Sequence, residues 1–179
     1  MTEHAVEKNS PQPKKARMSQ SQVKTMLVCF FDHKGIVHYD FITQGQTVNQ
    51  QCYLEVPTRL RECVWRKRPE LWPDKLILHH DSAPAHGVLR VHEFLAKNSI
   101  TKLDHSPDLA PCNFWLFPKL KNALKGQRFD ELSDIQRNVK TLLQGIPEND
   151  FQDCFRHWHH RLTKCISSQG GYFTGDTNR

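Results

Sequence analysis

Hydrophobic residues have a strand-like pattern in one part of the chain and a helical spacing in others. The strand-like pattern lies between residues 26 and 42. There they form two runs rich in β-branched and aromatic residues, Met26–Phe31 and Ile36–Ile42, around Asp32-His33-Lys34-Gly35. Two such runs, joined by a short segment that begins with aspartate and ends with glycine, are typical of a β-hairpin. We predict a hairpin here, in which Asp32 stabilises the turn rather than binding a metal ion.

From Thr47 the spacing of hydrophobic residues changes to three and four, which indicates a helix. This helix closes on Arg66-Lys67-Arg68, whose positive charge suits the C-terminal end of a helix dipole. Pro57 lies inside it and costs about 3 kcal/mol in a helix interior, so we expect a kink or a split there. The residues that mark the buried stripe are Tyr53, Val56, Leu60 and Val64.

The next segment predicts a strand, a helix and a second strand. Leu76–His80 is aliphatic, Val88, Val91, Phe94 and Leu95 have helical spacing, and Ile100–Leu103 is a short apolar run. This order is typical of a parallel, right-handed crossover.

Three further helices are predicted after residue 110. Ser133-Asp134-Ile135-Gln136 resembles a capping box that begins a helix running to Leu143. Pro147 begins the last helix, and Gly170-Gly171 ends it. The apolar positions of the first of these helices are Phe114, Phe117, Leu120 and Leu124, with Pro118 in its early turns; those of the last are Phe151, Phe155, Trp158, Leu162 and Ile166.

Composition and charge narrow the class of partner. Of 179 residues, 37% are hydrophobic, and the formal net charge is +6. A basic balance favours a polyanion such as DNA, although composition alone does not establish one. The longest apolar run, Met26–Phe31, is far shorter than the roughly 20 residues that a membrane span needs. We therefore expect neither a membrane nor a small-molecule substrate as a partner.

The cysteines indicate a reducing compartment. No pair has C-x-x-C spacing, and the chain opens without a charged-then-apolar signal segment. We predict free, buried thiols in an intracellular protein, with the nucleus favoured over the cytoplasm. A zinc site is not favoured, because on a helix His159 and His160 cannot both join the face of Cys154 and Cys165, and the spacing, which includes His157, matches no common zinc finger.

Three regions follow from composition. Residues 1–22 hold a single β-branched apolar residue, Val6, and no aromatic residue, so we predict a disordered basic tail. In it, Lys14, Lys15 and Arg17 suit a nuclear-import patch or a phosphate contact, as well as a merely solvated tail. Residues 23–175 form one predicted domain, and 176–179 a short tail.

Chemistry-bearing residues gather between Leu76 and Leu120. Asp81 ends a predicted buried strand between His80 and a proline-bearing turn, and a Pro-rich loop delivers Asn113 to the head of another helix. Side chains at strand and helix ends are how two-metal phosphoryl-transfer sites are often built. Of His79 and His80, we expect one to point into the core.

Several motifs together carry a resemblance to a known family. They are His80-Asp81-Ser82-Ala83-Pro84-Ala85-His86, Ser106-Pro107-Asp108-Leu109-Ala110-Pro111, Asn113-Phe114-Trp115-Leu116-Phe117, Gly171-Tyr172-Phe173 and the hairpin phrase Phe31–Tyr39. Over residues 13 to 175 the sequence resembles the catalytic domain of mariner-type transposases, in particular truncated, host-adopted copies in animal genomes.

The resemblance implies an α/β, RNase H-like fold of the retroviral-integrase type, with a mixed sheet, flanking helices and a three-acid Mg²⁺ site for DNA strand cleavage and joining. Asp81 corresponds to the second acid. The third falls on Asn113, and not on Asp108 of the Ser-Pro-Asp-Leu loop. The family's first acid lies upstream of the hairpin, and we expect this chain to lack it, together with the helix-turn-helix pair that reads transposon ends. The sheet would then be incomplete at its N-terminal central strand.

These correspondences give one leading hypothesis and two alternatives. The leading one is a catalytically inactive, transposase-derived protein with residual nonspecific DNA binding, without a cofactor, in which Asp81 and Asn113 remain as vestigial ligands without metal. One alternative is a residual Mg²⁺-dependent endonuclease or strand transferase that recruits Asp32 or Asp108. Another is a protein-interaction module, pairing with itself or a related transposase, or an unstable remnant. The predicted DNA contacts are Lys14, Lys15, Arg17, Arg66, Lys67, Arg68, Lys119 and Lys121.

Overall fold

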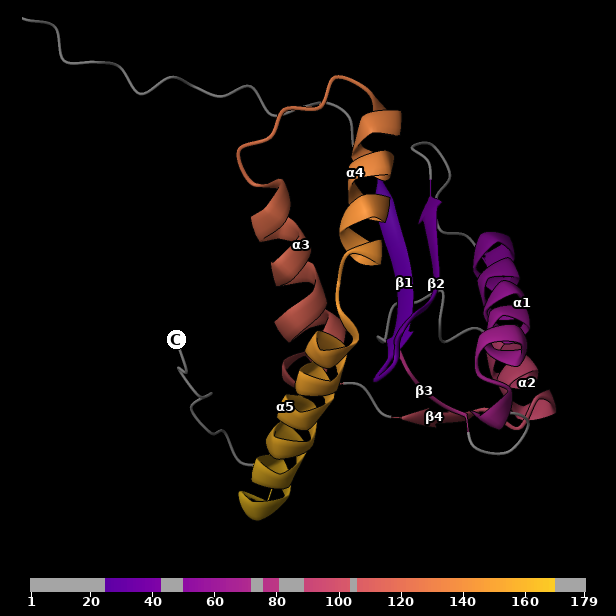
Figure 1. Ribbon diagram of the computed structural model, residues 1–179. Coiled ribbons are helices and arrows are strands. Elements are labelled where there is room, and N and C mark those ends of the chain that lie inside the picture. The colour runs from indigo at the N-terminus through magenta and orange to yellow at the C-terminus, as the bar shows by residue number, and fades with distance from the viewer. Residues whose placement is uncertain (1–24, 43–49, 72–75, 81–88, 104–105, 170–179) are drawn as a thin grey trace, which may run out of the picture.

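A β-hairpin lies between two groups of helices in the computed structural model (Figure 1). The structure describes residues 25–42, 50–71, 76–80, 89–103 and 106–169, without the side chains of 50–57 and 89–91. The elements are β1 (Met26–Asp32), β2 (Gly35–Ile42), α1 (Gln50–Lys67), η1 (Pro69–Leu71), β3 (Ile77–His79), α2 (Leu89–Lys97), β4 (Thr101–Leu103), η3 (Pro107–Leu109), η4 (Cys112–Leu116), α3 (Phe117–Leu124), α4 (Leu132–Gln144) and α5 (Glu148–Ser167). The predicted tails 1–22 and 176–179, and Gly170-Gly171, lie outside the described residues.

The predicted hairpin is confirmed, together with the role of Asp32 in its turn. Strands β1 and β2 pair antiparallel. The backbone N–H groups of Lys34 and Gly35 donate to Asp32 Oδ1 at 2.8 and 3.0 Å. Gly35 has a φ of +131°, which a residue with a side chain adopts only under strain. The turn therefore depends on one carboxylate and one glycine.

A β-bulge at Val37 shifts the side-chain alternation of β2. The register changes between Phe30 and Phe31, which pair with His38 and Ile36, so Val37 is the extra residue. Ile36 contacts the α3–α4 side, whereas Val37 packs with α1 and His38 Nδ1 lies 3.6 Å from Cys63 Sγ of the same helix. A bulge places two successive side chains on one side of a strand in this way.

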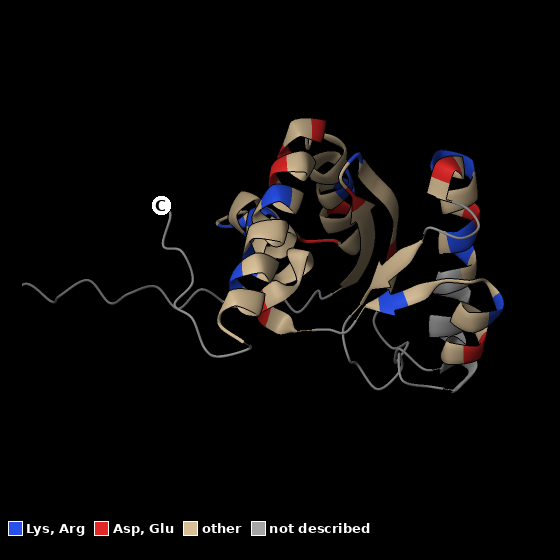
Figure 2. Ribbon diagram, turned by 90° about the horizontal axis from the view of Figure 1, so that it is seen from below, with Lys and Arg blue, Asp and Glu red and all other residues tan. Residues whose placement is uncertain are grey.

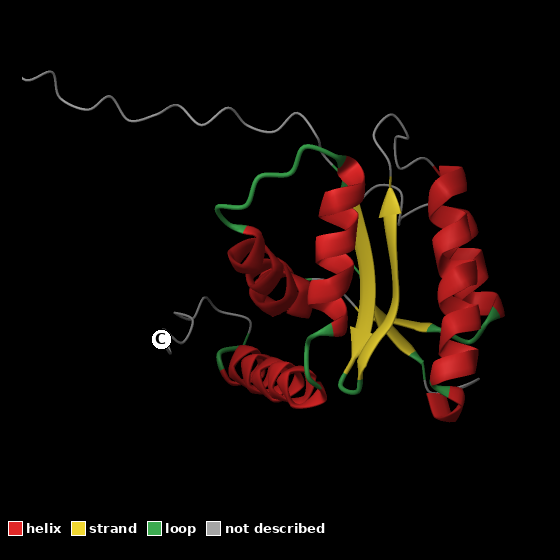
Figure 3. Cartoon of the chain, turned by 45° about the horizontal axis from the view of Figure 1, so that its top comes forward, coloured by secondary structure: helices red, strands yellow, loops and turns green. Residues whose placement is uncertain are grey.

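Helices lie on both sides of the hairpin (Figure 3), and the hairpin packs apolar side chains against each group. One face packs against a cluster of α3, α4 and η4 residues: Leu116, Leu120, Val139 and Leu143. The other face packs through Phe30 and Val37 against Leu60 and Val64 of α1. The aromatic ring of Phe31 lies 5.5 to 6.1 Å from the rings of Trp115, Phe151 and Phe155, which joins α5 to the first cluster.

Helix α1 runs without a break from Gln50 to Lys67, so of the kink or split predicted at Pro57 the split is wrong. Proline removes one backbone hydrogen bond, to the carbonyl of Tyr53, but the ten residues that follow it are anchored by the buried Leu60 and Val64. Polar contacts fix both ends of this part of the helix. Arg59 Nη1 lies 2.5 Å from Asp40 Oδ2, and Lys67 Nζ donates to the carbonyl of Val37 at 2.8 Å.

Directly after α1, Arg68 binds the turn carboxylate with two bonds. Its Nε donates to Asp32 Oδ2 at 2.6 Å and its Nη2 to Asp32 Oδ1 at 3.1 Å. The hydrogen bond to Asp32 raises the pKa of Arg68 above its ordinary value. Both side chains are mostly buried, with 14% and 18% of their surfaces exposed. One aspartate therefore stabilises the turn and holds the end of α1 to it.

The predicted strand–helix–strand unit is confirmed as a parallel pair, with Ile77, Leu78 and His79 opposite Thr101, Lys102 and Leu103. Among the described residues β1 pairs only with β2, and β3 only with β4. The interruption of the sheet that the resemblance implied is therefore present between the described strands. No described helix is long and apolar enough to cross a membrane.

Two details of the C-terminal helices differ from the prediction. The capping box is not formed: the N-cap residue of α4 is Glu131, one residue before Leu132, and the Ser133 hydroxyl donates to the Glu131 carboxylate at 3.0 Å. Ile166 is 78% exposed, so the apolar face of α5 ends before it. Pro147 precedes α5 as predicted.

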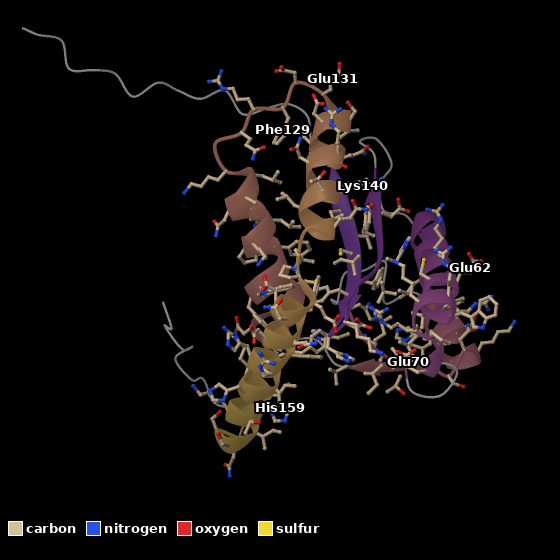
Figure 4. The ribbon with its side chains drawn as sticks, in the orientation of Figure 1. Glu62, Glu70, Phe129, Glu131, Lys140 and His159 are labelled. Carbon is tan, nitrogen blue, oxygen red and sulfur yellow. The ribbon has the colours of Figure 1, made fainter. Side chains whose placement is uncertain are left out.

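We expect Asp32→Asn to lower the free energy of unfolding by roughly 1.5–3 kcal/mol, because it leaves the partly buried Arg68 without a counter-charge. For a chain of this size that corresponds to roughly 3–12 °C in Tm, measured by thermal denaturation. The matched control is Glu70→Gln near the end of α1 (Figure 4), which removes the exposed ion pair to Lys34. An exposed pair contributes little, so Tm should stay nearly constant. Equal effects of the two substitutions would contradict this assignment.

His38 should make stability depend on pH. Burial is the largest cause that lowers its pKa, with Arg59 and Lys67 adding to it and Asp40 opposing it. The unfolded chain therefore binds a proton at this site near pH 6.5, while the folded chain remains neutral, so stability falls as pH falls below about 6.5. His38→Phe should reduce the slope of unfolding free energy against pH between 7.5 and 5.5. His159→Gln on the exposed face of α5 (Figure 4) is the control, and an unchanged slope in His38→Phe would refute the assignment.

Candidate functional site

The end of β3 and the start of η4 lie around one cavity. His79, two residues before Asp81, and Cys112, directly before Asn113, both line it. Asp81 itself lies outside the described residues. His80 is buried, with 8% of its surface exposed, as predicted for one of the two histidines, while the ring of His79 lies 5.6 Å from that of Trp158.

Asn113 is exposed and is held by the preceding loop. Its Nδ2 donates to the carbonyl of Pro107 at 3.3 Å, and its backbone N–H donates to the carbonyl of Ala110 at 2.9 Å. A carbonyl only accepts hydrogen bonds, so this contact orients the amide with its nitrogen towards Pro107. The side chain offers one neutral oxygen to any other partner. An ionised carboxylate at this position has no hydrogen-bond donor, so it could not bind the Pro107 carbonyl in this way.

Asn113 belongs to a π-helical segment, η4, which sequence reasoning did not predict. The N–H of Phe117 donates to the carbonyl of Cys112, five residues before it. Pro118 follows in the first turn of α3 and has no N–H to give to Asn113 or Phe114. Single π-helical turns are frequent at functional sites. The proline gives a local reason for the irregular turn.

The two acids considered as replacements are placed differently. Both oxygens of Asp32 accept from Arg68 or from the turn amides. Asp108 is exposed in η3, and its backbone carbonyl accepts from Arg161 at 3.2 Å. Arg161 also lies over the ring of Phe114, 4.5 Å from its centre, so the loop that carries Asp108 is fixed to α5.

A pair of divalent cations prefers several carboxylate oxygens. Within the described residues, no three His, Cys, Asp or Glu side chains are grouped to hold a metal ion. Of the candidate ligands they contain, Asn113 is neutral, the charge of Asp32 is compensated by Arg68, and Asp108 is exposed in the separate segment η3. The described residues therefore do not fit a two-metal site by themselves.

The buried thiols do not supply a reactive group. The five cysteines whose side chains the structure describes are free, as predicted, but of these five only Cys154 is fully buried. Burial is the main cause that raises the pKa of Cys154 to about 12, and burial likewise raises the pKa of Cys29. Both thiols remain protonated at neutral pH, and a protonated thiol is neither a good nucleophile nor a metal ligand.

Some of the predicted DNA contacts near the end of α1 already bind other groups of this chain. Lys67 donates to the hairpin backbone and Arg68 to Asp32, while Arg66 has only a weak contact to Cys63 Sγ at 3.9 Å. Lys14, Lys15 and Arg17 lie outside the described residues. Among the three described side chains, Arg66 is the one left most available to a phosphate.

The other predicted contacts lie on α3. Lys119 forms an ion pair with Asp150 at 2.6 Å and lies 5.7 Å from the centre of the Trp115 ring, whereas Lys121 is exposed. Helices α1 and α3 are on opposite sides of the hairpin, and Lys and Arg residues are spread over both sides (Figures 1 and 2). The two basic groups do not form one contiguous patch.

The cavity has a volume of about 520 Å³ and was not predicted from the sequence. It is bordered by Cys29–His33, Leu76–His79, residues of α1 and residues of α5, among them Trp158. The indole N–H of Trp158 is buried and has no hydrogen-bond acceptor among the described residues. The strands and helices that border the cavity were predicted from the sequence, and the resemblance implied an interrupted sheet, but not a cavity lined by residues of both α1 and α5.

Comparisons with known proteins agree with this arrangement. The family described as "Transposase (partial DDE domain)" matches residues 2–73. The chain is 33% identical over 175 residues to the mariner Mos1 transposase of Drosophila mauritiana, covering 93% of this chain and 50% of that protein. It is 27% identical over 154 residues to the human histone-lysine N-methyltransferase SETMAR, covering 84% of this chain and 22% of that protein. The chain thus spans half the length, or less, of these relatives.

Solved structures give the same result. The catalytic domain of Mos1 mariner transposase superimposes with a TM-score of 0.79 at 31% identity, over 85% of this chain and 77% of that one. The Mos1 paired-end complex with left transposon end gives a TM-score of 0.81 at 30% identity, over 97% of this chain and 52% of that one. The hairpin, the parallel pair and the flanking helices are therefore those of an RNase H-like domain, and the chain belongs to the mariner-type transposase family.

Proposed function

We propose that this transposase-derived domain performs no DNA strand cleavage and binds DNA weakly, without sequence preference. Its family is that of the DDE transposases, so the chain descends from an enzyme. The observation that carries the proposal is Asn113, the residue in the position of the third acid by resemblance. It is an exposed amide whose nitrogen is turned towards the Pro107 carbonyl.

Charge is the physical basis for the loss of catalysis. In two-metal phosphoryl transfer, carboxylates hold the two cations and so fix the attacking and leaving oxygens. An amide oxygen is a neutral ligand, and replacing a carboxylate by it removes one full negative charge from the site. Neither Asp32, bound by Arg68, nor Asp108 in its separate turn supports a substitute role.

Weak DNA binding is supported by charge and by relatives. The chain carries a formal net charge of +6, which attracts a polyanion irrespective of its sequence. Mos1 transposase has been solved in a complex with a transposon end. Because the accessible basic residues Arg66 and Lys121 lie on opposite sides of the hairpin, each would contribute a separate phosphate contact.

The proposal predicts no Mg²⁺-dependent nicking by the purified chain, measured on supercoiled plasmid over a series of pH values with Mg²⁺ or Mn²⁺. Asn113→Asp should not restore nicking by itself, and it should change stability by less than about 0.5 kcal/mol because the side chain is exposed. Metal-dependent nicking by the unchanged chain that disappears in Asp81→Ala would overturn the proposal in favour of a residual nuclease.

DNA binding should weaken steeply with salt. Each phosphate contact adds about 0.9 to the slope of log K against log salt for duplex DNA, so Arg66→Ala and Lys121→Ala should each lower the slope by about one or less. The matched control is Lys119→Ala, whose ammonium already pairs with Asp150. Fluorescence anisotropy with duplexes of two unrelated sequences measures both the slope and the preference. Absence of binding at 20–50 mM salt would refute this part of the proposal.

A further inference from the structure

We propose that Cys63 is a site of covalent modification by anionic, low-molecular-weight disulfides such as glutathione disulfide. The thiol is partly exposed near the end of α1, and two nitrogen groups lie beside it. His38 Nδ1 of β2 lies 3.6 Å from Cys63 Sγ, and Arg66 Nη2 lies 3.9 Å from the same sulfur. Accessible thiols with a histidine and an arginine as neighbours are the ones that react in proteins.

Hydrogen bonding places the proton of His38 on the nitrogen that faces the thiol. Burial is the main cause that lowers the pKa of His38, so at pH 7 the ring is neutral and carries one N–H. The other ring nitrogen, Nε2, is buried and has no hydrogen-bond partner among the described residues. A buried N–H without an acceptor is rarer than a buried acceptor without a donor, so we assign the proton to Nδ1. Two N–H donors therefore point at the Cys63 sulfur, where they stabilise the negative charge that develops during thiol exchange.

Other cysteines of the chain show what is particular to Cys63. Burial raises the pKa of Cys29 and of Cys154, so both thiols stay protonated at neutral pH. Cys165 of α5 is partly exposed, as Cys63 is. Among the described residues, however, no side-chain nitrogen lies within hydrogen-bond distance of the Cys165 sulfur. Cys165 is therefore an internal control for exposure without the two donors.

The charge around Cys63 favours an anionic reagent. Residues 59–68 include five basic residues and one acidic residue, Glu62. Figure 4 shows Glu62 on the side of α1 away from the hairpin, whereas Cys63 contacts the hairpin through His38. Arg66 is exposed and pairs with no carboxylate in the described part of the chain. Because a guanidinium binds a carboxylate with two parallel hydrogen bonds, a disulfide that carries carboxylates suits this site.

The reaction is a thiol–disulfide exchange, in which the disulfide itself is the oxidant. The Cys63 sulfur attacks one sulfur of glutathione disulfide, so that a new S–S bond forms to Cys63 and the original S–S bond breaks. One glutathione leaves as a thiolate and takes up the proton that Cys63 has lost. Enzymes with a Cys–His pair orient the histidine through a third group, and Nε2 of His38 has no such partner among the described residues. We therefore infer one reversible, stoichiometric modification rather than catalytic turnover.

The test incubates the reduced full chain with glutathione disulfide near neutral pH and locates the products by peptide mass spectrometry. We expect modification of Cys63 at least about tenfold faster than of Cys165, and its reversal by dithiothreitol. Cys63→Ser should remove the fast product. In urea the difference between the two cysteines should disappear, because only the fold brings His38 to Cys63. Equal rates at Cys63 and Cys165 in the folded chain would refute the proposal.

Variants of Arg66 test the preference for an anionic reagent. Arg66→Gln should slow the reaction of Cys63 with glutathione disulfide about 3- to 10-fold, because a positive charge beside the reacting sulfur is lost. Arg66→Lys keeps the charge and should keep most of the rate. Cystamine, a disulfide with two ammonium groups, should not react more slowly with Arg66→Gln than with the unchanged chain. Equal slowing of both disulfides in Arg66→Gln would overturn the assignment of an anionic partner.

Variants of His38 test the hydrogen bond to the sulfur. His38→Phe keeps a ring against Phe30, whose centre lies 6.4 Å from that of His38, but removes the N–H. We expect it to slow the reaction of Cys63 with both disulfides about 3- to 10-fold. His38→Asn offers an amide N–H near the position of Nδ1 and should recover part of the rate, and thermal denaturation checks that both variants fold. A merely structural role of His38 predicts the opposite, since looser packing would expose the thiol, so an unchanged or faster reaction in His38→Phe would overturn the proposal.

Discussion

The structure depends on a hairpin that is covered on both faces. Alternation along β1 points Phe31 towards η4 and α5 and Phe30 towards α1. The bulge at Val37 gives β2 the same two faces, because Ile36 packs on the α3–α4 side and Val37 on the α1 side. Each fully buried large apolar side chain contributes roughly 1.5–3 kcal/mol, so the two clusters supply most of the attraction between layers. Asp32 makes the arrangement specific, because the same carboxylate shapes the turn and binds Arg68 at the end of α1.

Local patterns in the sequence were sufficient for most of the elements. The hairpin and the strand–helix–strand unit were predicted because alternation, helical spacing and turn residues all indicated the same structure. Of the kink or split predicted at Pro57, the split was wrong because tertiary burial of Leu60 and Val64 outweighs one lost hydrogen bond. The capping box was wrong because Ser133 and Glu131 contact each other at the helix start, a choice that the four-residue pattern does not determine.

The candidate site could be predicted only in part, and for a different reason. The correspondence of Asp81 and Asn113 came from the resemblance, whereas no periodicity distinguishes a metal ligand from an ordinary loop residue. The orientation of the Asn113 amide depends on the carbonyl of Pro107, six residues away, and on the π-helical turn ahead of Pro118. The space between β1 and β3 depends on contacts far apart in sequence, and a pattern within one element carries no information about it.

The proposed loss of catalysis and the interrupted sheet differ in their effect on the stability of the folded state. An exposed amide in place of a carboxylate has little effect on stability, because solvent satisfies either group. The edges of β1 and β3 are different, since backbone groups beside an apolar cavity need partners and two-stranded sheets are marginal by themselves. The β3–β4 pair is only three residues long. Its stability therefore depends on the packing of Leu76 and Leu78 against Leu60 and Val64 of α1.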